Sequence, residues 1–368
     1  MLILIFLSAF SYFLALFSKK LAYSHKIYNA TGQSLPHPIS FALPLVLFTV
    51  FSGLRSGVGD TFFTMHAFSL LPENMERPYI FEKEFLYSLL VWFLRRSTEN
   101  PQFLIFIGAL FFCPAALYFL YKNSLYYELA LFLFVATGYY TFSFNGMRQY
   151  MAAGILILGS KYLFSEEKTD LIKFALIVLL AFSFHSSALI MLPLYFLVRQ
   201  KSFSLWIFIL IFSAFLGLAL FDLLLPRFLE ILSFTDFSVY EESGWFTSGQ
   251  EGGASLVRFF TALIPPILAY QARARLKKFG LRADVLINMS FVNLAFYILA
   301  LYNWIFARFA IYTEIYNIVL ITWLVGLAFK KRDRRLAYFL CVIFYILFFV
   351  GISYSVVEYR SDFFRTVF

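Results

Sequence analysis

The stretch that decides the fold is Gln102–Leu120, QFLIFIGALFFCPAALYFL, which contains no charged residue. At about 1.5 Å of rise per residue, a helix of this length is about 28 Å long. The hydrocarbon core of a bilayer is about 30 Å thick. The stretch therefore predicts a transmembrane helix.

Apolar runs of similar length recur along the whole chain, at residues 2–17, 40–53, 125–142, 148–164, 203–221, 256–271, 285–304, 309–329 and 336–357. The composition agrees, since 61% of residues are hydrophobic, 14% are charged and the mean hydropathy is +0.78. Soluble domains have about 25% charged residues, so a soluble enzyme, a disordered chain and a DNA-binding domain are excluded. We predict an all-α, polytopic integral membrane protein with about 10–12 transmembrane helices, forming a single domain over residues 1–368.

Two segments depart from the simple pattern. Residues 85–94 are apolar for only half the length of a span before Arg95 and Arg96, so residues 79–96 are predicted to form an amphipathic helix at the membrane interface. Residues 171–198 are too long for one span and have a polar centre, Ser183–Ser187. We expect two half-spans with the polar residues at the bend, because non-helical backbone at membrane depth must be buried or line a cavity.

The charge of +9 is mostly explained by topology. Most basic residues fall in the loops that an outside N-terminus would place in the cytoplasm, as the positive-inside rule requires, so no nucleic-acid partner is expected. The first apolar run has no basic residues before it, which favours a retained span over a cleaved signal peptide. Two long outer loops result, residues 54–101 and 222–255. The second suits either a lid over a polar ligand or an ordinary loop.

Charges at the outer face are the candidates for function, because charges near a bilayer are costly and mark sites. Arg55 and Asp60 enclose a glycine-containing turn, and Arg148 opens an apolar helix next to Asn145 and Gln149. An arginine beside free helix N–H groups is a good receptor for phosphate. The alternative for each is simple anchoring of the arginine at the interface.

His185 lies in the polar centre of residues 171–198. Histidine has an ordinary pKa near neutrality, so His185 is a candidate general base. The alternative is a hydrogen-bonded histidine between helices. Arg308 and Arg360 add two more cations at the outer side, again with anchoring as the alternative. Four arginines with a histidine and acids predict a cavity for a phosphate-bearing lipid.

The sequence resembles the EpsG family of bacterial exopolysaccharide polymerases, relatives of the Wzy-type polymerases of O-antigen and capsule. The resemblance rests on Arg55–Asp60, on Glu84 ahead of an apolar helix, on Ser143–Ala152 and on Ala181–Ala188. The pair Arg148-Gln149-x-x-Ala152 and Phe184-His185-x-Ser187-Ala188 is its most specific part. Thr61-Phe62 follows the Gly-x-Asp element where the family usually has Tyr.

The resemblance implies a GT-C-like membrane glycosyltransferase of the bacterial cytoplasmic (inner) membrane, with its active site facing the outside or periplasm. Donor and acceptor would be undecaprenyl-pyrophosphate-linked oligosaccharides. The product would have inverted stereochemistry, and no metal or other cofactor is expected. A flippase and a chain-length regulator are further expected partners, beside membrane lipids.

The resemblance also implies roles for individual residues. Arg148 and Arg308, with Arg55 or Arg360, would bind the leaving pyrophosphate. His185 would deprotonate or orient the acceptor hydroxyl, with Asp60 or Glu84 as a competing base or sugar ligand, and Asn145 and Gln149 would hold sugar hydroxyls. Two other functions remain open: an acyltransferase that modifies a surface glycan, and a transporter of lipid-linked oligosaccharide.

Overall fold

The computed structural model describes residues 2–18, 29–72, 84–223, 254–353 and 359–363. Within these ranges every secondary-structure element is a helix. The prediction of an all-α membrane protein is confirmed. The helices divide between two compact units, the first formed by Met1–Leu192 with Ile321–Phe368 and the second by Pro193–Leu320.

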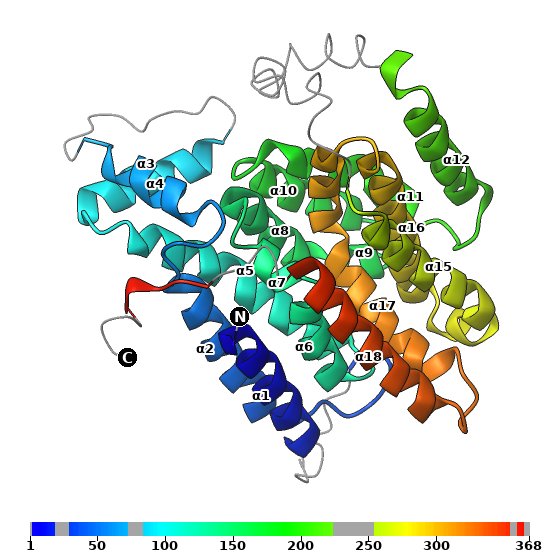
Figure 1. Cartoon of the computed structure of the whole chain (residues 1–368). Helices are drawn as coiled ribbons and strands as arrows, with labels where there is room; N and C mark the ends of the chain where they lie inside the picture. The colour runs from blue at the N-terminus through cyan, green and yellow to red at the C-terminus, as the bar shows by residue number, and fades with distance from the viewer. Residues whose placement is uncertain (1, 19–28, 73–83, 224–253, 354–358, 364–368) are drawn as a thin grey trace. The chain divides into compact units, whose positions relative to one another are not determined.

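Figure 1 shows the helices of both units. The first unit contains α1 (Leu2–Ser18), α2 (Ile39–Gly53), α3 (Thr61–Ser69), α4 (Phe85–Ser97), α5 (Gln102–Asn123), α6 (Tyr127–Ala136), α7 (Tyr139–Phe142), α8 (Met147–Gly159), α9 (Lys161–Phe164), α10 (Asp170–Phe182), the 3₁₀ helix η1 (Ser186–Ile190) and α18 (Arg334–Ser353). The second contains α12 (Leu205–Ala219), α15 (Leu256–Leu276), η2 (Lys277–Phe279), α16 (Leu281–Ala300) and η3 (Trp304–Tyr312). Two helices, α11 (Met191–Val198) and α17 (Glu314–Leu327), pass from one unit to the other.

Among the described residues, three helices are long and apolar enough to cross a membrane: α5, α16 and α18. Helices η3 and α17, which meet at a bend of 67°, meet the same criterion when taken together. Five shorter apolar helices of 10–17 residues accompany them. The count of 10–12 spans stays a prediction. Large apolar side chains on α12 and α18 are exposed, among them Leu205, Phe212, Phe339 and Leu347, as expected for surfaces in contact with lipid.

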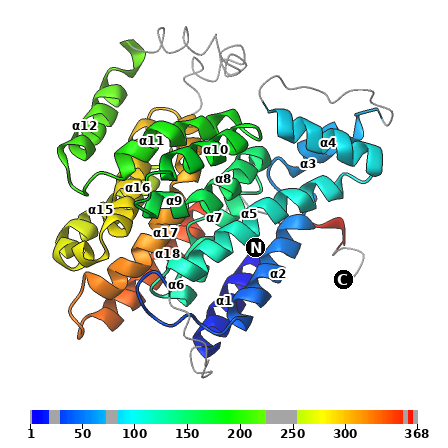
Figure 2. The ribbon, with the colours of Figure 1, turned by 180° about the vertical axis from the view of Figure 1, so that it is seen from behind.

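The first unit is built around α5, which packs against both α2 and α8 (Figures 1 and 2). Its contact with α8 is close because Gly154 of α8 faces the backbone of α5. A Cβ atom at Gly154 would lie 2.2 Å from the carbonyl oxygen of Phe111. Small residues let membrane helices approach in this way.

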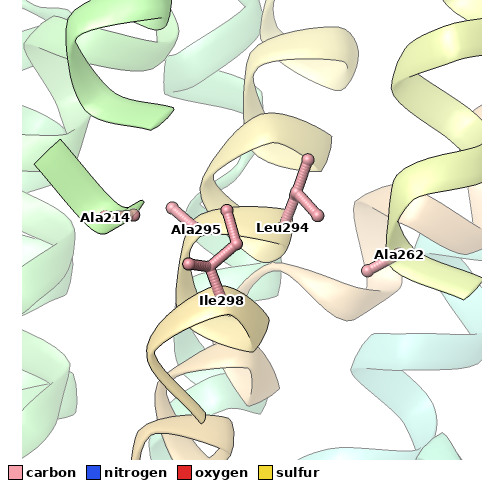
Figure 3. Packing of buried hydrophobic residues seen from close by; sticks show 5 residues of the cluster. All are labelled: Ala214, Ala262, Leu294, Ala295 and Ile298. Atoms are coloured by element: carbon pink, nitrogen blue, oxygen red, sulfur yellow. The ribbon is translucent and has the colours of Figure 1, made fainter. Parts of the chain in front are cut away.

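The second unit is built around α16, which packs against α12, α15 and η3. Figure 3 shows one core cluster of this unit, in which Ala214 of α12 and Ala262 of α15 pack with Leu294, Ala295 and Ile298 of α16. The buried Asn288 of α16 donates hydrogen bonds to the carbonyls of Val198 and Gln200, at 3.0 and 2.7 Å. This asparagine ties α16 to the end of α11.

The predicted break in residues 171–198 is confirmed, since α10 ends at Phe182 and η1 begins at Ser186. The expected span 125–142 is also interrupted. Its helix α6 ends at Ala136, because Gly138 has a positive φ of 85° that stops the helix before α7. Helix α4 covers most of the predicted interfacial helix, whose residues 79–83 lie outside the described residues. Most of the predicted outer loop 222–255 also lies outside them.

Candidate active site

Arg55 follows the end of α2 and is buried, with 1% of its surface exposed. Its Nε donates to Thr61 Oγ1 at 3.0 Å, and its Nη1 donates to Ser52 Oγ at 3.0 Å. The guanidinium also lies over the ring of Phe144, 5.0 Å from its centroid. Burial lowers the pKa of Arg55, while the nearby Asp60 carboxylate raises it. Arg55 therefore holds the turn of residues 52–61 in place.

The same turn contacts the segment before α8. Asp60 Oδ2 accepts a hydrogen bond of 2.6 Å from the backbone N–H of Gly146. Gly59 has a φ of +59°, and a Cβ atom there would lie 2.6 Å from the carbonyl oxygen of Phe144. The two glycines allow this approach, because a larger residue at position 59 would both strain the backbone and collide. Asp60 thus fixes the start of α8, the helix that carries Arg148 and Gln149.

Residues 359–362 form a strap over the turn. Ser56 N–H donates to the carbonyl of Arg360 at 2.9 Å, and Asp362 N–H donates to Ser56 Oγ at 3.1 Å. Tyr359 Oη donates to the carbonyl of Phe51 at 2.8 Å. Arg360 itself is exposed. Residues 359–362 are therefore tied to the same loop as Arg55 and Asp60, although more than 300 residues separate them in sequence.

Arg148, in the first turn of α8, forms an ion pair with Glu84, the residue that precedes α4. The Glu84 side chain is 10% exposed, whereas that of Arg148 is 43% exposed. The Arg148 guanidinium also lies over the ring of Tyr87, 5.6 Å from its centroid. Burial raises the pKa of Tyr87 to about 12, so Tyr87 stays neutral. Arg148 is thus held from one side and accessible from the other.

Gln149, the residue after Arg148 on α8, is linked to His185 through Ser187. Gln149 Nε2 donates to Ser187 Oγ at 3.2 Å, and Ser187 Oγ lies 2.7 Å from His185 Nδ1. The backbone N–H of Ser187 also donates to His185 Nδ1, at 3.3 Å. A backbone N–H can only donate, so Nδ1 accepts and a neutral His185 carries its proton on Nε2.

The turn that contains His185 also contacts the start of α4. The backbone N–H groups of Leu86 and Tyr87 donate to the carbonyl of Ser183, at 3.0 and 3.3 Å. This contact places the start of α4, with Glu84, against the break between α10 and η1. Glu84, Arg148, Gln149 and His185 are therefore brought to one end of the first unit.

The structure thus gathers seven of the nine predicted residues through direct contacts, in two linked groups: Arg55, Asp60 and Arg360 around the turn, and Glu84, Arg148, Gln149 and His185 beside it. Asn145 lies between them and is exposed, next to Gly146. Arg308 belongs to the second unit, where its guanidinium lies over Trp304 at 5.1 Å. Sequence reasoning did not assign roles to Ser187, Tyr87 or Thr61, which orient the predicted residues and have no charge that would single them out.

A comparison with protein families matches the EpsG family over residues 39–363. The chain belongs to the EpsG family. The family match covers most of the chain and includes all nine predicted site residues, from Arg55 to Arg360. Comparisons with curated proteins and with solved structures found no match. The EpsG family is associated with polysaccharide biosynthesis.

Proposed function

We propose that the protein is a polysaccharide polymerase of the bacterial cytoplasmic membrane, with its site at the outer face. It would join oligosaccharide repeat units that are linked to undecaprenyl pyrophosphate. The observation that carries this proposal is the grouping of Arg148, Glu84, Gln149 and His185 in a member of the EpsG family. A cation for pyrophosphate and side chains for a sugar hydroxyl are the groups that such a transfer needs.

Arg148 is the best candidate for the pyrophosphate ligand. Arginine has five N–H donors, and its fork matches the spacing of phosphate oxygens. Glu84 pairs with Nη1 of Arg148. The Arg148 side chain is 43% exposed, so its guanidinium can also reach a ligand. Its place in the first turn of α8 adds helix N–H groups for the anion. No metal is needed in this scheme, because arginine would stabilise the charge that develops on the leaving group.

The reaction moves one glycan between two lipid carriers. The hydroxyl at the non-reducing end of the acceptor attacks the anomeric carbon of the donor glycan. A C–O glycosidic bond forms, the bond from that carbon to the pyrophosphate oxygen breaks, and undecaprenyl pyrophosphate leaves. The hydroxyl proton passes to a base on the enzyme. Attack opposite the leaving group would invert the configuration at the anomeric carbon.

The tautomer of His185 suggests which residue orients the acceptor hydroxyl and which takes its proton. With Nδ1 accepting from Ser187, the neutral ring donates through Nε2 and orients the acceptor oxygen. The proton would then pass to a carboxylate, for which Glu84 and Asp60 are the candidates. Glu84 lies beside Arg148, whereas Asp60 accepts from Gly146 N–H. Glu84 is therefore closer to the proposed pyrophosphate ligand.

The other predicted residues would assist. Gln149 supports His185 through Ser187, and the exposed Asn145 would hold a sugar hydroxyl. Arg360 is exposed and would add positive charge for the lipid carrier, while Arg55 shapes the turn. Arg308 is proposed as a further pyrophosphate ligand. A flippase and a chain-length regulator are the protein partners expected for such an enzyme.

The test is a deletion strain complemented with variants. We expect the deletion strain to accumulate single repeat units on the lipid carrier, and Arg148→Ala or His185→Ala to restore no long polymer although both variants reach the membrane. Lys173→Ala is the matched control, because Lys173 forms an exposed ion pair with Glu167 near the opposite end of α10 from His185. Full-length but undecorated polymer in the deletion strain would identify an acyltransferase, and units trapped on the cytoplasmic side would identify a transporter.

A further inference from the structure

A second group of polar side chains lies in the second unit, at the bend between η3 and α17. Asn293 of α16 donates from Nδ2 to Glu314 Oε2 at 3.0 Å and to Thr313 Oγ1 at 3.1 Å. Asn317 Nδ2 donates to Asn293 Oδ1 at 2.9 Å. Asn293, Thr313 and Asn317 are buried. These residues lie in a helix long enough to cross the membrane and in the bent pair beside it.

Two further side chains extend the group. Arg258 of α15 interacts electrostatically with Glu314. It also forms a side-chain hydrogen bond with Tyr297, one helical turn after Asn293 on α16. We call Arg258, Asn293, Tyr297, Glu314 and Asn317 the unit-2 polar cluster. It brings together residues of α15, α16 and α17, all within Pro193–Leu320.

Two observations indicate that this cluster does more than supply hydrogen bonds at the bend between η3 and α17. Glu314 is only partly buried as a residue, and its Oε2 accepts from the Asn293 amide. Asn317 is 3% exposed, and among the described residues its Oδ1 has no hydrogen-bond partner. A buried polar atom without a partner is costly, and ionisable groups inside membrane segments mark functional sites. A ligand with hydrogen-bond donors would satisfy both Glu314 and Asn317.

The chemistry of the cluster selects the ligand. Arg258 and Glu314 are of opposite charge type, so the site has no cluster of like charges that would select an anion such as phosphate or a metal cation. The amides of Asn293 and Asn317 and the Tyr297 hydroxyl offer both donors and acceptors. The matching ligand is neutral and carries several hydroxyl groups, which is the character of a sugar ring.

We propose that the unit-2 polar cluster binds the sugar part of a glycan, as a site separate from the pyrophosphate ligand Arg148. That the glycan is a polymerase substrate rests on the proposed function, but sugar binding does not. In a polymerase such a site would recognise the sugars of the repeat unit, whereas the arginines recognise the lipid carrier common to all repeat units. The cluster would therefore contribute specificity for the glycan.

The test measures binding of oligosaccharides, prepared by partial hydrolysis of the host's surface polysaccharide, to the full-length protein in lipid nanodiscs. Glu314→Gln and Tyr297→Phe keep the shape of their side chains, and each is expected to weaken binding about tenfold through the loss of hydrogen bonds. Asn288→Ala is the matched control, since this buried asparagine of α16 lies outside the unit-2 polar cluster and its amide donates to the carbonyls of Val198 and Gln200. It should leave the binding constant unchanged. Melting curves verify that each variant is folded.

Oligosaccharide binding that is absent in the wild type, or unchanged in both folded variants, would overturn the proposal. Arg148→Ala should bind the oligosaccharide normally, because it lies in the other unit. If the deletion strain makes normal polymer while the wild-type protein still binds oligosaccharide through Glu314, the polymerase function is refuted and the sugar site stands.

Discussion

Replacing Gly154 by alanine should displace α8 and reduce activity without touching a charged residue. A Cβ atom at this position would lie 2.2 Å from the carbonyl oxygen of Phe111 and 2.9 Å from its carbonyl carbon. Both atoms belong to the backbone of α5, so no side-chain rotation can relieve the contact. An ordinary carbon contact is about 3.5 Å, and the two helices must therefore separate by about 1 Å.

The magnitude follows from two opposed effects. Alanine gains up to about 1 kcal/mol over glycine inside a helix, whereas overpacking costs about 1–3 kcal/mol. Because the collision is with backbone, we expect the upper value and a net loss of about 2 kcal/mol. Arg148 lies six residues earlier on α8, about 9 Å away along the axis. A misplacement of about 1 Å at a catalytic group can reduce the rate about a hundredfold.

The assay compares melting temperature and polymer yield for Gly154→Ala and for Gly351→Ala. The control makes the same chemical change in α18, where a Cβ atom would meet no atom of the described residues within 4 Å. Gly351→Ala should melt at the same or a higher temperature and make normal polymer, whereas Gly154→Ala should melt lower and make little. Equal melting temperatures and equal polymer for the two variants would refute the close packing of α5 and α8 as the support of the site.

Three further predictions concern the loops and the histidine. Gly59→Ala should abolish polymer formation while the protein remains in the membrane, because the φ of +59° and the 2.6 Å approach to Phe144 require glycine; normal polymer would contradict the packing of the two loops. Tyr359→Phe should lower the unfolding free energy by about 1 kcal/mol through loss of its hydrogen bond to Phe51, and an unchanged melting temperature would show that the strap contributes no stability. Ser187→Ala should reduce kcat about tenfold with little change in KM, since Ser187 positions His185 and does not bind substrate; a raised KM at unchanged kcat would contradict that role.

The fold class could be predicted from the sequence because the apolar runs have the length and composition of membrane-spanning helices. The break in residues 171–198 was also predictable, since its excess length and the polar Ser183–Ser187 centre point to the same place. The end of α6 was not, because Gly138 lies within an apolar run and its positive φ depends on how the chain turns toward α7. The local composition predicts how long an apolar segment is, but it does not predict where the helix within that segment is interrupted.

The members of the site were predictable as isolated charges, but their partners were not. Glu84 and Arg148 are 64 residues apart, and only the folding of α4 onto the break after α10 brings them together. The sequence marked Arg55 as a candidate cation for pyrophosphate near Asp60, whereas the structure buries it against Ser52, Thr61 and Phe144. The unit-2 polar cluster was not predictable, because Asn293 and Asn317 are uncharged and Glu314 is a single acidic residue six positions after Arg308.

Purified protein in liposomes, supplied with lipid-linked single repeat units extracted from the deletion strain, gives a direct measurement of the proposed polymerase activity. We expect a ladder of longer glycans, with one undecaprenyl pyrophosphate released for each bond formed. Arg148→Ala should give neither product, while Lys173→Ala should give both. Glycans that stay one unit long in the presence of folded wild-type protein, or elongation by Arg148→Ala at the wild-type rate, would contradict the proposal.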